Sequence, residues 1–198
     1  DSQEHWDERA KSFSFKDTPD AYLQSFISKA GITGKESVLD MGCGTGSLAV
    51  ALAAMGCSVV AADFSEGMLD RLCSKAAERG MLWERGTSGF GSGGFPAGDF
   101  EACPSEVQAG KILPLLMSWE DDWANYGLGE GSVDVAVASR SVITRDLEDS
   151  LQKLSAVARE RVCVTVGAGV SPRVDMRVAR AMGLELERHN DALFVFGI

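Results

Sequence analysis

Residues 38–53 read VLDMGCGTGSLAVALA, in which three glycines within five positions separate a short strand-like segment from an apolar run. Glycine inside a regular element costs about 0.5–1 kcal/mol relative to alanine, so the cluster requires an explanation. Either the chain turns sharply at this point, or another group comes close to its backbone.

The glycines stand at positions 42, 44 and 46, shortly after Asp40. The pattern predicts a strand over 37–41, a turn, and a helix over 47–55 closed by a glycine. Such a turn presents bare backbone N–H groups at the positive end of a helix, and ligands of open parallel sheets bind beyond the carboxyl ends of the strands.

The spacing argues against two phosphate-binding motifs. A dinucleotide-binding GxGxxG motif would need glycine where Ser47 stands, and no GK[ST] follows to make a P-loop. A carboxylate directly before the glycines does not help to bind phosphate. Asp40 instead suits a ligand that carries an ammonium group and a sulfonium.

A second acidic position follows the next predicted strand, SVVAA at 58–62. Asp63 ends that strand, 21 residues after Gly42, and its two carboxylate oxygens could accept both hydroxyls of a ribose. The alternative is an ordinary strand-end aspartate that caps the next helix. Ser65 is expected to cap that helix, which runs to about Arg79.

The remaining pattern alternates helices with strands. It is helical over 6–30 with a break at Thr18-Pro19, and VDVAVA at 133–138 and VCVTV at 162–166 are apolar strands. A helix that starts at Asp146 separates these two strands. This order predicts βαβ units, and so an α/β fold with a parallel sheet covered by helices on both faces.

Two segments break the alternation. Residues 84–110 carry seven glycines and two prolines, which predicts a long loop or an extra flap. Residues 191–198, DALFVFGI, form either a last strand or the first turns of a helix whose remainder is missing. A truncated end is the favoured interpretation.

The sequence DMGCGTG at 40–46, followed by AADFSEGML at 61–69, resembles the class I S-adenosylmethionine-dependent methyltransferases. The resemblance implies a Rossmann-like sandwich with helices on both faces of a mostly parallel, seven-stranded-type sheet. It further implies a C-terminal hairpin, part of which a truncated sequence would lack. It also implies a single domain over 1–198, with an N-terminal lid at about 1–30 and a glycine-rich insertion at about 84–110.

The resemblance implies S-adenosyl-L-methionine as cofactor. Asp40 would lie by the methionine moiety, the glycine backbone would pack against the cofactor, Asp63 would hold the ribose, and Phe64 and Met68 would flank the adenine. The full set of implied cofactor contacts is Asp40, Met41, Gly42, Cys43, Gly44, Thr45, Gly46, Asp63, Phe64, Ser65, Met68, Ser118, Trp119, Glu120 and Ser139.

The third region of the family departs from its usual pattern here. The candidate is MSWEDDW, in which Ser118 occupies the usual acidic position, Trp119 stands beside it, and Glu120 or the acid after it is shifted along. The alternative is that Trp119 and Trp123 anchor the core while the acids start a helix.

The fourth region is ASRSVI, at the end of the strand over 133–138. The resemblance implies that Ser139 touches the cofactor, while Arg140 and Ser141 point toward the substrate or brace the loop. For Arg140 the alternative is a structural pair with a carboxylate.

The N-terminal HWDERAKSF resembles the amphipathic lid that many small-molecule methyltransferases place over the cofactor. Trp6 and Phe13 would cover the cofactor, and Arg9 would pair with an acid. A surface helix pinned by Trp6 is the alternative.

Composition excludes several other classes. The chain has 198 residues, a net charge of −10, two histidines and five cysteines without a CxxC pair. The expectations are reduced thiols in a cytoplasmic protein and no metal site. No nucleic-acid partner is expected because of the charge, and no membrane span because no apolar run reaches about 18 residues.

These observations lead to one main hypothesis, a methyltransferase that moves a methyl group to a small-molecule acceptor by direct displacement. The acceptor and any catalytic residue are not identified, and a homodimer is compatible with the sequence. A protein of the same fold that binds the cofactor without transferring a methyl group is the alternative. An NAD-dependent oxidoreductase is disfavoured by Asp40 and by the glycine spacing.

Overall fold

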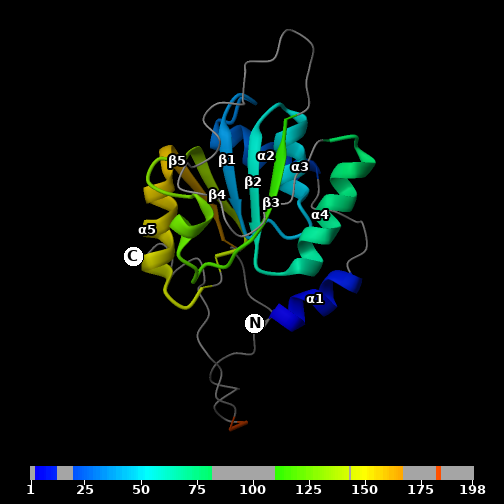
Figure 1. Ribbon diagram of the computed structural model, residues 1–198, viewed down its shortest axis with the longest axis vertical. Helices are drawn as coiled ribbons and strands as arrows, with labels where there is room; N and C mark the ends of the chain where they lie inside the picture. The colour runs from blue at the N-terminus through cyan, green and yellow to red at the C-terminus, as the bar shows by residue number, and fades with distance from the viewer. Residues whose placement is uncertain (1–2, 13–19, 82–109, 143, 167–181, 184–198) are drawn as a thin grey trace.

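The structure is a computed structural model that describes residues 3–12, 20–81, 110–142, 144–166 and 182–183. Figure 1 shows a central sheet with helices packed around it. In chain order the elements are α1 (Gln3–Ser12), α2 (Asp20–Ala30), β1 (Ser37–Met41), α3 (Ser47–Ala54), β2 (Ser58–Asp63), α4 (Glu66–Glu78), β3 (Ile112–Leu116), the 3-10 helix η1 (Trp123–Tyr126), β4 (Val133–Ser139), α5 (Leu147–Val157) and β5 (Ala158–Thr165).

The described strands form one parallel sheet in the order β3-β2-β1-β4-β5. The chain moves outward from β1 through β2 to β3 and then crosses to the other side, so the order reverses between β1 and β4. The predicted Rossmann-like α/β fold is confirmed. The sixth and seventh strands and the expected C-terminal hairpin concern residues outside the described parts of the chain, as does nearly all of the glycine-rich insertion.

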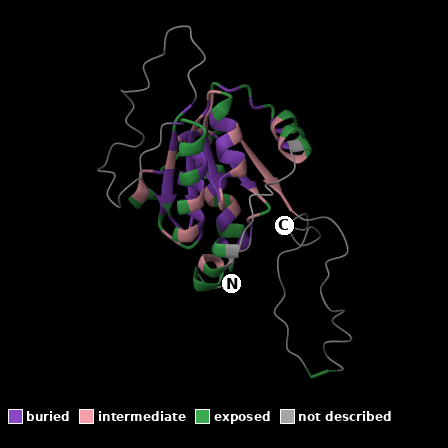
Figure 2. Cartoon of the chain, turned by 90° about the vertical axis from the view of Figure 1, so that its right-hand side faces the viewer, coloured by how far each residue is buried: buried purple, intermediate pink, exposed green. Residues whose placement is uncertain are grey.

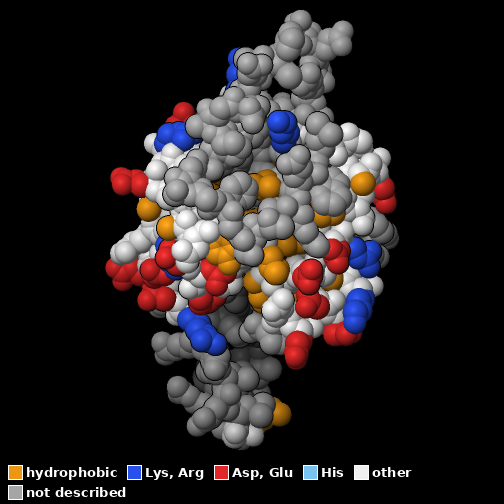
Figure 3. All heavy atoms as spheres, viewed as in Figure 1, with side chains coloured by type: hydrophobic (Ala, Val, Ile, Leu, Met, Phe, Trp, Pro, Cys, Tyr) orange, Lys and Arg blue, Asp and Glu red, His pale blue; other side chains and the backbone are white. Residues whose placement is uncertain are grey.

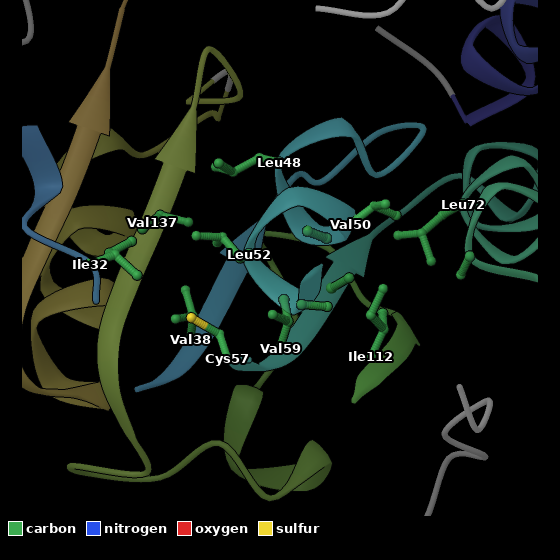
Figure 4. Packing of buried hydrophobic residues seen from close by; sticks show 14 of the residues in the cluster. Ile32, Val38, Leu48, Val50, Leu52, Cys57, Val59, Leu72, Ile112 and Val137 are labelled. Atoms are coloured by element: carbon green, nitrogen blue, oxygen red, sulfur yellow. The ribbon is translucent and has the colours of Figure 1, made fainter. Parts of the chain in front are cut away.

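The sheet divides the core into two layers. Val38 faces one layer, which α2, α3 and α4 complete, while Leu39 and Met41 face the other, which η1 and α5 cover. Figure 2 shows buried strands between helices whose outer faces are exposed, and Figure 4 shows part of the first layer. Because both faces of the sheet are covered, β1 is apolar on both sides apart from Ser37 at its start and Asp40.

The helix starts follow from side-chain capping. Ser65 accepts a hydrogen bond from the backbone N–H of Met68 at the start of α4, and Asp146 accepts one from Asp149 at the start of α5. Both residues are in the extended conformation that an N-cap requires. The predicted cap role of Ser65 is therefore confirmed, and so is the predicted helix start at Asp146.

Two strands differ from the sequence expectations. β3 contains Pro114 and was implied only by the family resemblance; proline is tolerated there because, among the described strands, β3 lies at the edge of the sheet. The prediction that the last described strand begins at Val162 is wrong, since β5 begins at Ala158. Arg159 and Glu160, near its start, are polar and exposed, so hydrophobicity marks only its later part.

The carboxylate of Glu36, just before the amino end of β1, is half-buried and is held by backbone N–H groups. The carboxylate of Glu36 accepts hydrogen bonds from the backbone N–H groups of Thr33 (3.0 Å), Gly34 (3.0 Å) and Lys35 (2.9 Å). Partial burial raises the pKa of Glu36, but the hydrogen bonds from Thr33 and Lys35 outweigh it and lower the pKa to about 2. The charged form is therefore part of the folded structure.

Glu36→Gln is expected to lower the free energy of unfolding by about 1–3 kcal/mol at pH 7, because the N–H groups lose a charged acceptor. The pKa is depressed, so this stabilisation is present above the ordinary value of 4.5 and is lost as the pH falls toward 2. Urea unfolding at pH 7 and pH 3 measures it. The exposed Glu130→Gln is the control; equal loss in both variants would contradict the role of Glu36.

None of the helices within the described ranges is long and apolar enough to span a membrane.

Candidate functional site

Two buried carboxylates meet at the carboxyl ends of neighbouring strands. Asp40 lies next to the last residue of β1 and is 1% exposed, and Asp63 is the last residue of β2 and is 6% exposed. The parallel register aligns Met41 with Ala62, which brings both acids to the same edge of the sheet. The glycine turn that follows β1 lies at this edge.

The three glycines of the turn have left-handed backbones and different surroundings. A Cβ on Gly42 would lie 2.3 Å from the Cβ of Ser141, and a Cβ on Gly46 would lie 2.5 Å from the side chain of Leu72. A Cβ on Gly44 would meet nothing within 4 Å. Gly42 and Gly46 thus allow close packing inside the protein, whereas Gly44 faces open space.

The carboxylate of Asp40 is buried, and its hydrogen bonding among the described residues is incomplete. Burial raises the pKa of Asp40 to about 7, the negative charge of Asp63 adds to the rise, and a hydrogen bond from the backbone of Ala49 opposes it. The Oδ2 atom is buried without a hydrogen-bond partner among the described residues. A buried oxygen of this kind is expected to accept from a bound donor, and a cationic donor would also stabilise the charge.

Asp63 holds the turn together. Its Oδ2 accepts a hydrogen bond from the backbone N–H of Gly44 at 2.8 Å, and its Oδ1 accepts one from Ser65 at 2.9 Å. Burial raises the pKa of Asp63, while these backbone hydrogen bonds act in the opposite direction. A carboxylate has about four lone-pair sites, so each oxygen can still accept another hydrogen bond.

The other predicted residues of the first two regions surround this pair. Met41 is buried, and its carbonyl accepts a hydrogen bond from Ser141. Cys43 and Thr45 are half-buried in the turn, and Phe64 is half-buried after β2. Ser65 and Met68 are buried, at 0% and 3% exposure.

In the third region, residues 117–123, the structure agrees with the alternative in which the two tryptophans anchor the core. Trp119 and Trp123 are buried in the core, with ring centroids 5.7 Å apart. Asp121 accepts a hydrogen bond from the backbone N–H of Ser118 at 2.8 Å, and Glu120 is exposed. The two tryptophans therefore anchor the core, and the adenine contacts predicted for this loop stay a prediction.

The fourth region joins the glycine turn directly. Ser141 Oγ donates to the carbonyl of Met41 at 2.5 Å, and the indole N–H of Trp119 donates to the carbonyl of Ser141 at 3.1 Å. Ser141 therefore braces the loop, which was one of its two expected roles. The brace connects the ends of β1 and β4 with the segment after β3.

Ser139 and Arg140 belong to a cluster around Tyr22 that the sequence did not reveal. The Tyr22 hydroxyl lies 2.7 Å from Ser139 Oγ and 2.8 Å from Thr165 Oγ1. The guanidinium of Arg140 lies 4.6 Å from the Tyr22 ring centroid. The backbone of Arg140 is left-handed, with φ 59°. The cofactor contact predicted for Ser139 stays a prediction.

The N-terminal helix lies beside the second acidic strand end. Asp7 of α1 accepts hydrogen bonds from Ser65 and Gly67, a contact that no sequence pattern predicted. The only signal was Gly67 itself, a glycine inside a helix. Trp6 is half-buried; Phe13 and the Arg9 side chain fall outside what the structure describes.

Acidic side chains gather along both flanks and the lower half of the face seen in Figure 3. Among the described residues no group of three or more His, Cys, Asp or Glu side chains could hold a metal ion.

Comparison with known proteins adds a family model and relatives. Residues 38–108 match the model of a methyltransferase domain. A protein of Haemophilus influenzae without an assigned function is 31% identical over 184 residues, which cover 91% of this chain and 56% of that protein. The chain thus spans little more than half the length of this relative.

Solved structures share the fold at low identity. Magnesium protoporphyrin IX methyltransferase from Synechocystis PCC 6803, solved with bound SAH, is 16% identical with a TM-score of 0.55, over 95% of this chain and 78% of that chain. A chain from Rhodobacter sphaeroides provisionally named a Zn-dependent alcohol dehydrogenase is 17% identical with a TM-score of 0.59, over 91% and 61%. Identities this low show the fold alone.

Proposed function

We propose that this chain is a class I S-adenosylmethionine-dependent methyltransferase, which binds S-adenosyl-L-methionine at the edge formed by β1 and β2 and transfers its methyl group to a small molecule. The match of residues 38–108 to a methyltransferase domain and the parallel sheet support this proposal. One observation carries the proposal: within the described parts of the chain the buried Asp40 carboxylate has an oxygen without a hydrogen-bond partner, and Gly44 of the turn that follows β1 faces open space. This combination suits a cationic ligand that approaches the backbone closely.

The residues present fit such a cofactor. Asp40 would accept the ammonium group of the methionine moiety, which would give Oδ2 the hydrogen bond that it lacks. Gly44 would let the ligand approach its backbone, and Asp63 would use its remaining lone pairs for the ribose hydroxyls.

The chain's own contribution is alignment. The bound cofactor supplies an electrophilic methyl group, which passes to the acceptor by direct displacement from sulfur. The glycine turn and the Ser141 brace hold the site rigid, and well-held geometry can supply about 7–11 kcal/mol of a barrier. No side chain is assigned as a general base, because displacement requires one only when the acceptor arrives protonated.

The acceptor class follows from charge. A net charge of −10 opposes a polyanionic acceptor, so we favour a small molecule over RNA or DNA. Cysteines 43, 57, 73 and 163 are free thiols, which supports a reducing, cytoplasmic location for the protein. A homodimer is part of the same proposal, and size-exclusion chromatography tests it.

Isothermal titration with S-adenosylmethionine, S-adenosylhomocysteine and NAD tests the proposal. We expect heat from both S-adenosyl ligands and none from NAD. No heat from either S-adenosyl ligand would refute the proposal, and heat from NAD would favour an oxidoreductase. Binding without turnover over a broad acceptor panel would favour the alternative, a binding protein that transfers no methyl group.

Asp63→Asn is expected to weaken S-adenosylhomocysteine binding about tenfold, since one charged acceptor is replaced by a donor. Affinity for methionine, which has no ribose, should change less than twofold. The matched control is Asp146→Asn, which alters a helix cap at α5. A similar loss of affinity for both ligands would show that Asp63 acts only by shaping the turn.

A further inference from the structure

Helix α1 is fastened to α4 at two points. Asp7 Oδ1 accepts hydrogen bonds from Ser65 Oγ at 2.5 Å and from the backbone N–H of Gly67 at 3.1 Å. One turn later, the guanidinium of Arg71 donates to the carbonyl of Lys11 at 3.1 Å. Figure 1 shows α1 beside the amino-terminal end of α4. The two ends of this contact therefore fix both the position and the direction of α1.

Gly67 explains how close α1 comes. A Cβ at this position would lie 3.2 Å from the Cβ of Ala10 and 3.3 Å from Asp7 Oδ1, which is tighter than ordinary contact. Ala10 is 2% exposed, so this face of α1 is closed against α4. Glycine is unfavourable inside a helix, and the docked α1 gives a reason for it here.

Ser65 links the helix to the cofactor site. Its backbone N–H donates to Asp63 Oδ1 at 2.9 Å, while its hydroxyl donates to Asp7. Ser65 is fully buried. Asp7, Ser65 and Asp63 thus form one continuous chain of hydrogen bonds that runs from α1 to the carboxylate assigned to the ribose.

We propose that Asp7 is a positioning residue for cofactor binding: it fastens α1 over the start of α4 and, through Ser65, orients the Asp63 carboxylate. This inference rests on the proposed function, because it concerns the same cofactor. It goes further in assigning the task to a residue of the N-terminal helix, 56 positions before Asp63. If α1 were released from α4, Ser65 would lose its hydrogen bond to Asp7. Its backbone N–H would then hold the Asp63 carboxylate less firmly.

The test compares Asp7→Ala, Asp7→Asn and the control Glu8→Gln, whose carboxylate pairs with Lys11 on the same exposed helix face. The readouts are S-adenosylhomocysteine affinity by titration and amide deuterium exchange of residues 3–12 without ligand. We expect Asp7→Ala to weaken binding about tenfold and to speed exchange in α1. Asp7→Asn, which keeps an acceptor oxygen, should lose about threefold, and Glu8→Gln should change neither readout.

Gly67→Ala gives a second, independent test. Its Cβ would push α1 away while alanine favours the α4 helix, so affinity should fall and α1 exchange should rise without a loss of melting temperature. Fast α1 exchange with unchanged affinity would overturn the positioning role, and unchanged exchange in Asp7→Ala would overturn the fastening. If the unaltered protein binds no S-adenosylhomocysteine, the proposed function and the positioning role fail together, while the exchange data still decide whether Asp7 fastens α1.

Discussion

Asp40→Asn is expected to make the ligand-free protein more stable and at the same time to lower its affinity for S-adenosylmethionine about 100-fold. Removing one partner of a buried charged pair costs about 2–5 kcal/mol of binding. Without ligand the same carboxylate destabilises the folded state. It is buried near the charge of Asp63, and one of its oxygens has no hydrogen-bond partner among the described residues. A residue that served the fold would behave in the opposite way.

The pH dependence follows from the raised pKa. Asp40 has an ordinary pKa of 3.8 and a pKa of about 7 in the folded protein, so the folded state binds more protons than the unfolded chain between these values. Stability is therefore greatest below pH 3.8 with respect to this group and falls as the pH rises to about 7, by about 4 kcal/mol. Asp40→Asn should remove that fall.

Urea unfolding at pH 5 and pH 8, together with titration of S-adenosylmethionine at pH 8, measures both effects. Asp134→Asn is the matched control, because hydrogen bonds from Ser37 and Arg159 outweigh its partial burial and lower the pKa of Asp134. That variant should lose stability at pH 8 and keep its affinity. If Asp40→Asn loses stability and keeps its affinity, Asp40 is structural.

Local patterns predicted most of the fold and placed Asp40 and Asp63 at strand ends, while the cofactor contacts assigned to these acids stay predictions. Glycine spacing, two strand-end acids and the cap residues Ser65 and Asp146 act within one or two turns of the chain, so the sequence carries their signal directly. The family resemblance extended this local information to the parallel sheet. The parallel direction of the described strands follows from the βαβ alternation, which the order of apolar and polar residues along the chain displays.

Contacts between distant segments were not predictable in the same way. Asp7 meets Ser65 across 58 positions, and Tyr22 meets Ser139 across 117, and neither pair leaves a periodic or spacing signal. The third region was ambiguous for a related reason: the tryptophans at 119 and 123 could suit either a ligand or a core. Only packing decides, and here it buries both.

The glycine turn itself separates folding from binding. Gly42→Ala is expected to destabilise the protein by about 3 kcal/mol, because the new Cβ would meet the Cβ of Ser141 at 2.3 Å on a backbone with φ 73°. Ser141 is held by its bond to Met41, so the neighbour cannot yield without moving the ends of β1 and β4. A drop of about 6–12 °C in melting temperature is the corresponding scale for a domain of this size.

Gly44→Ala is the matched variant, two residues along the same turn. Its backbone is also left-handed, with φ 55°, but its Cβ would point into open space, so the expected loss is only about 1 kcal/mol. Affinity for S-adenosylhomocysteine should nevertheless fall at least tenfold, since the methyl group would occupy the side from which the ligand approaches. Thermal unfolding and titration of the two variants decide whether the glycine cluster serves a sharp turn of the chain or the close approach of a ligand to its backbone. If Gly44→Ala binds normally, the turn is a folding device, and the ligand does not approach the backbone at this glycine.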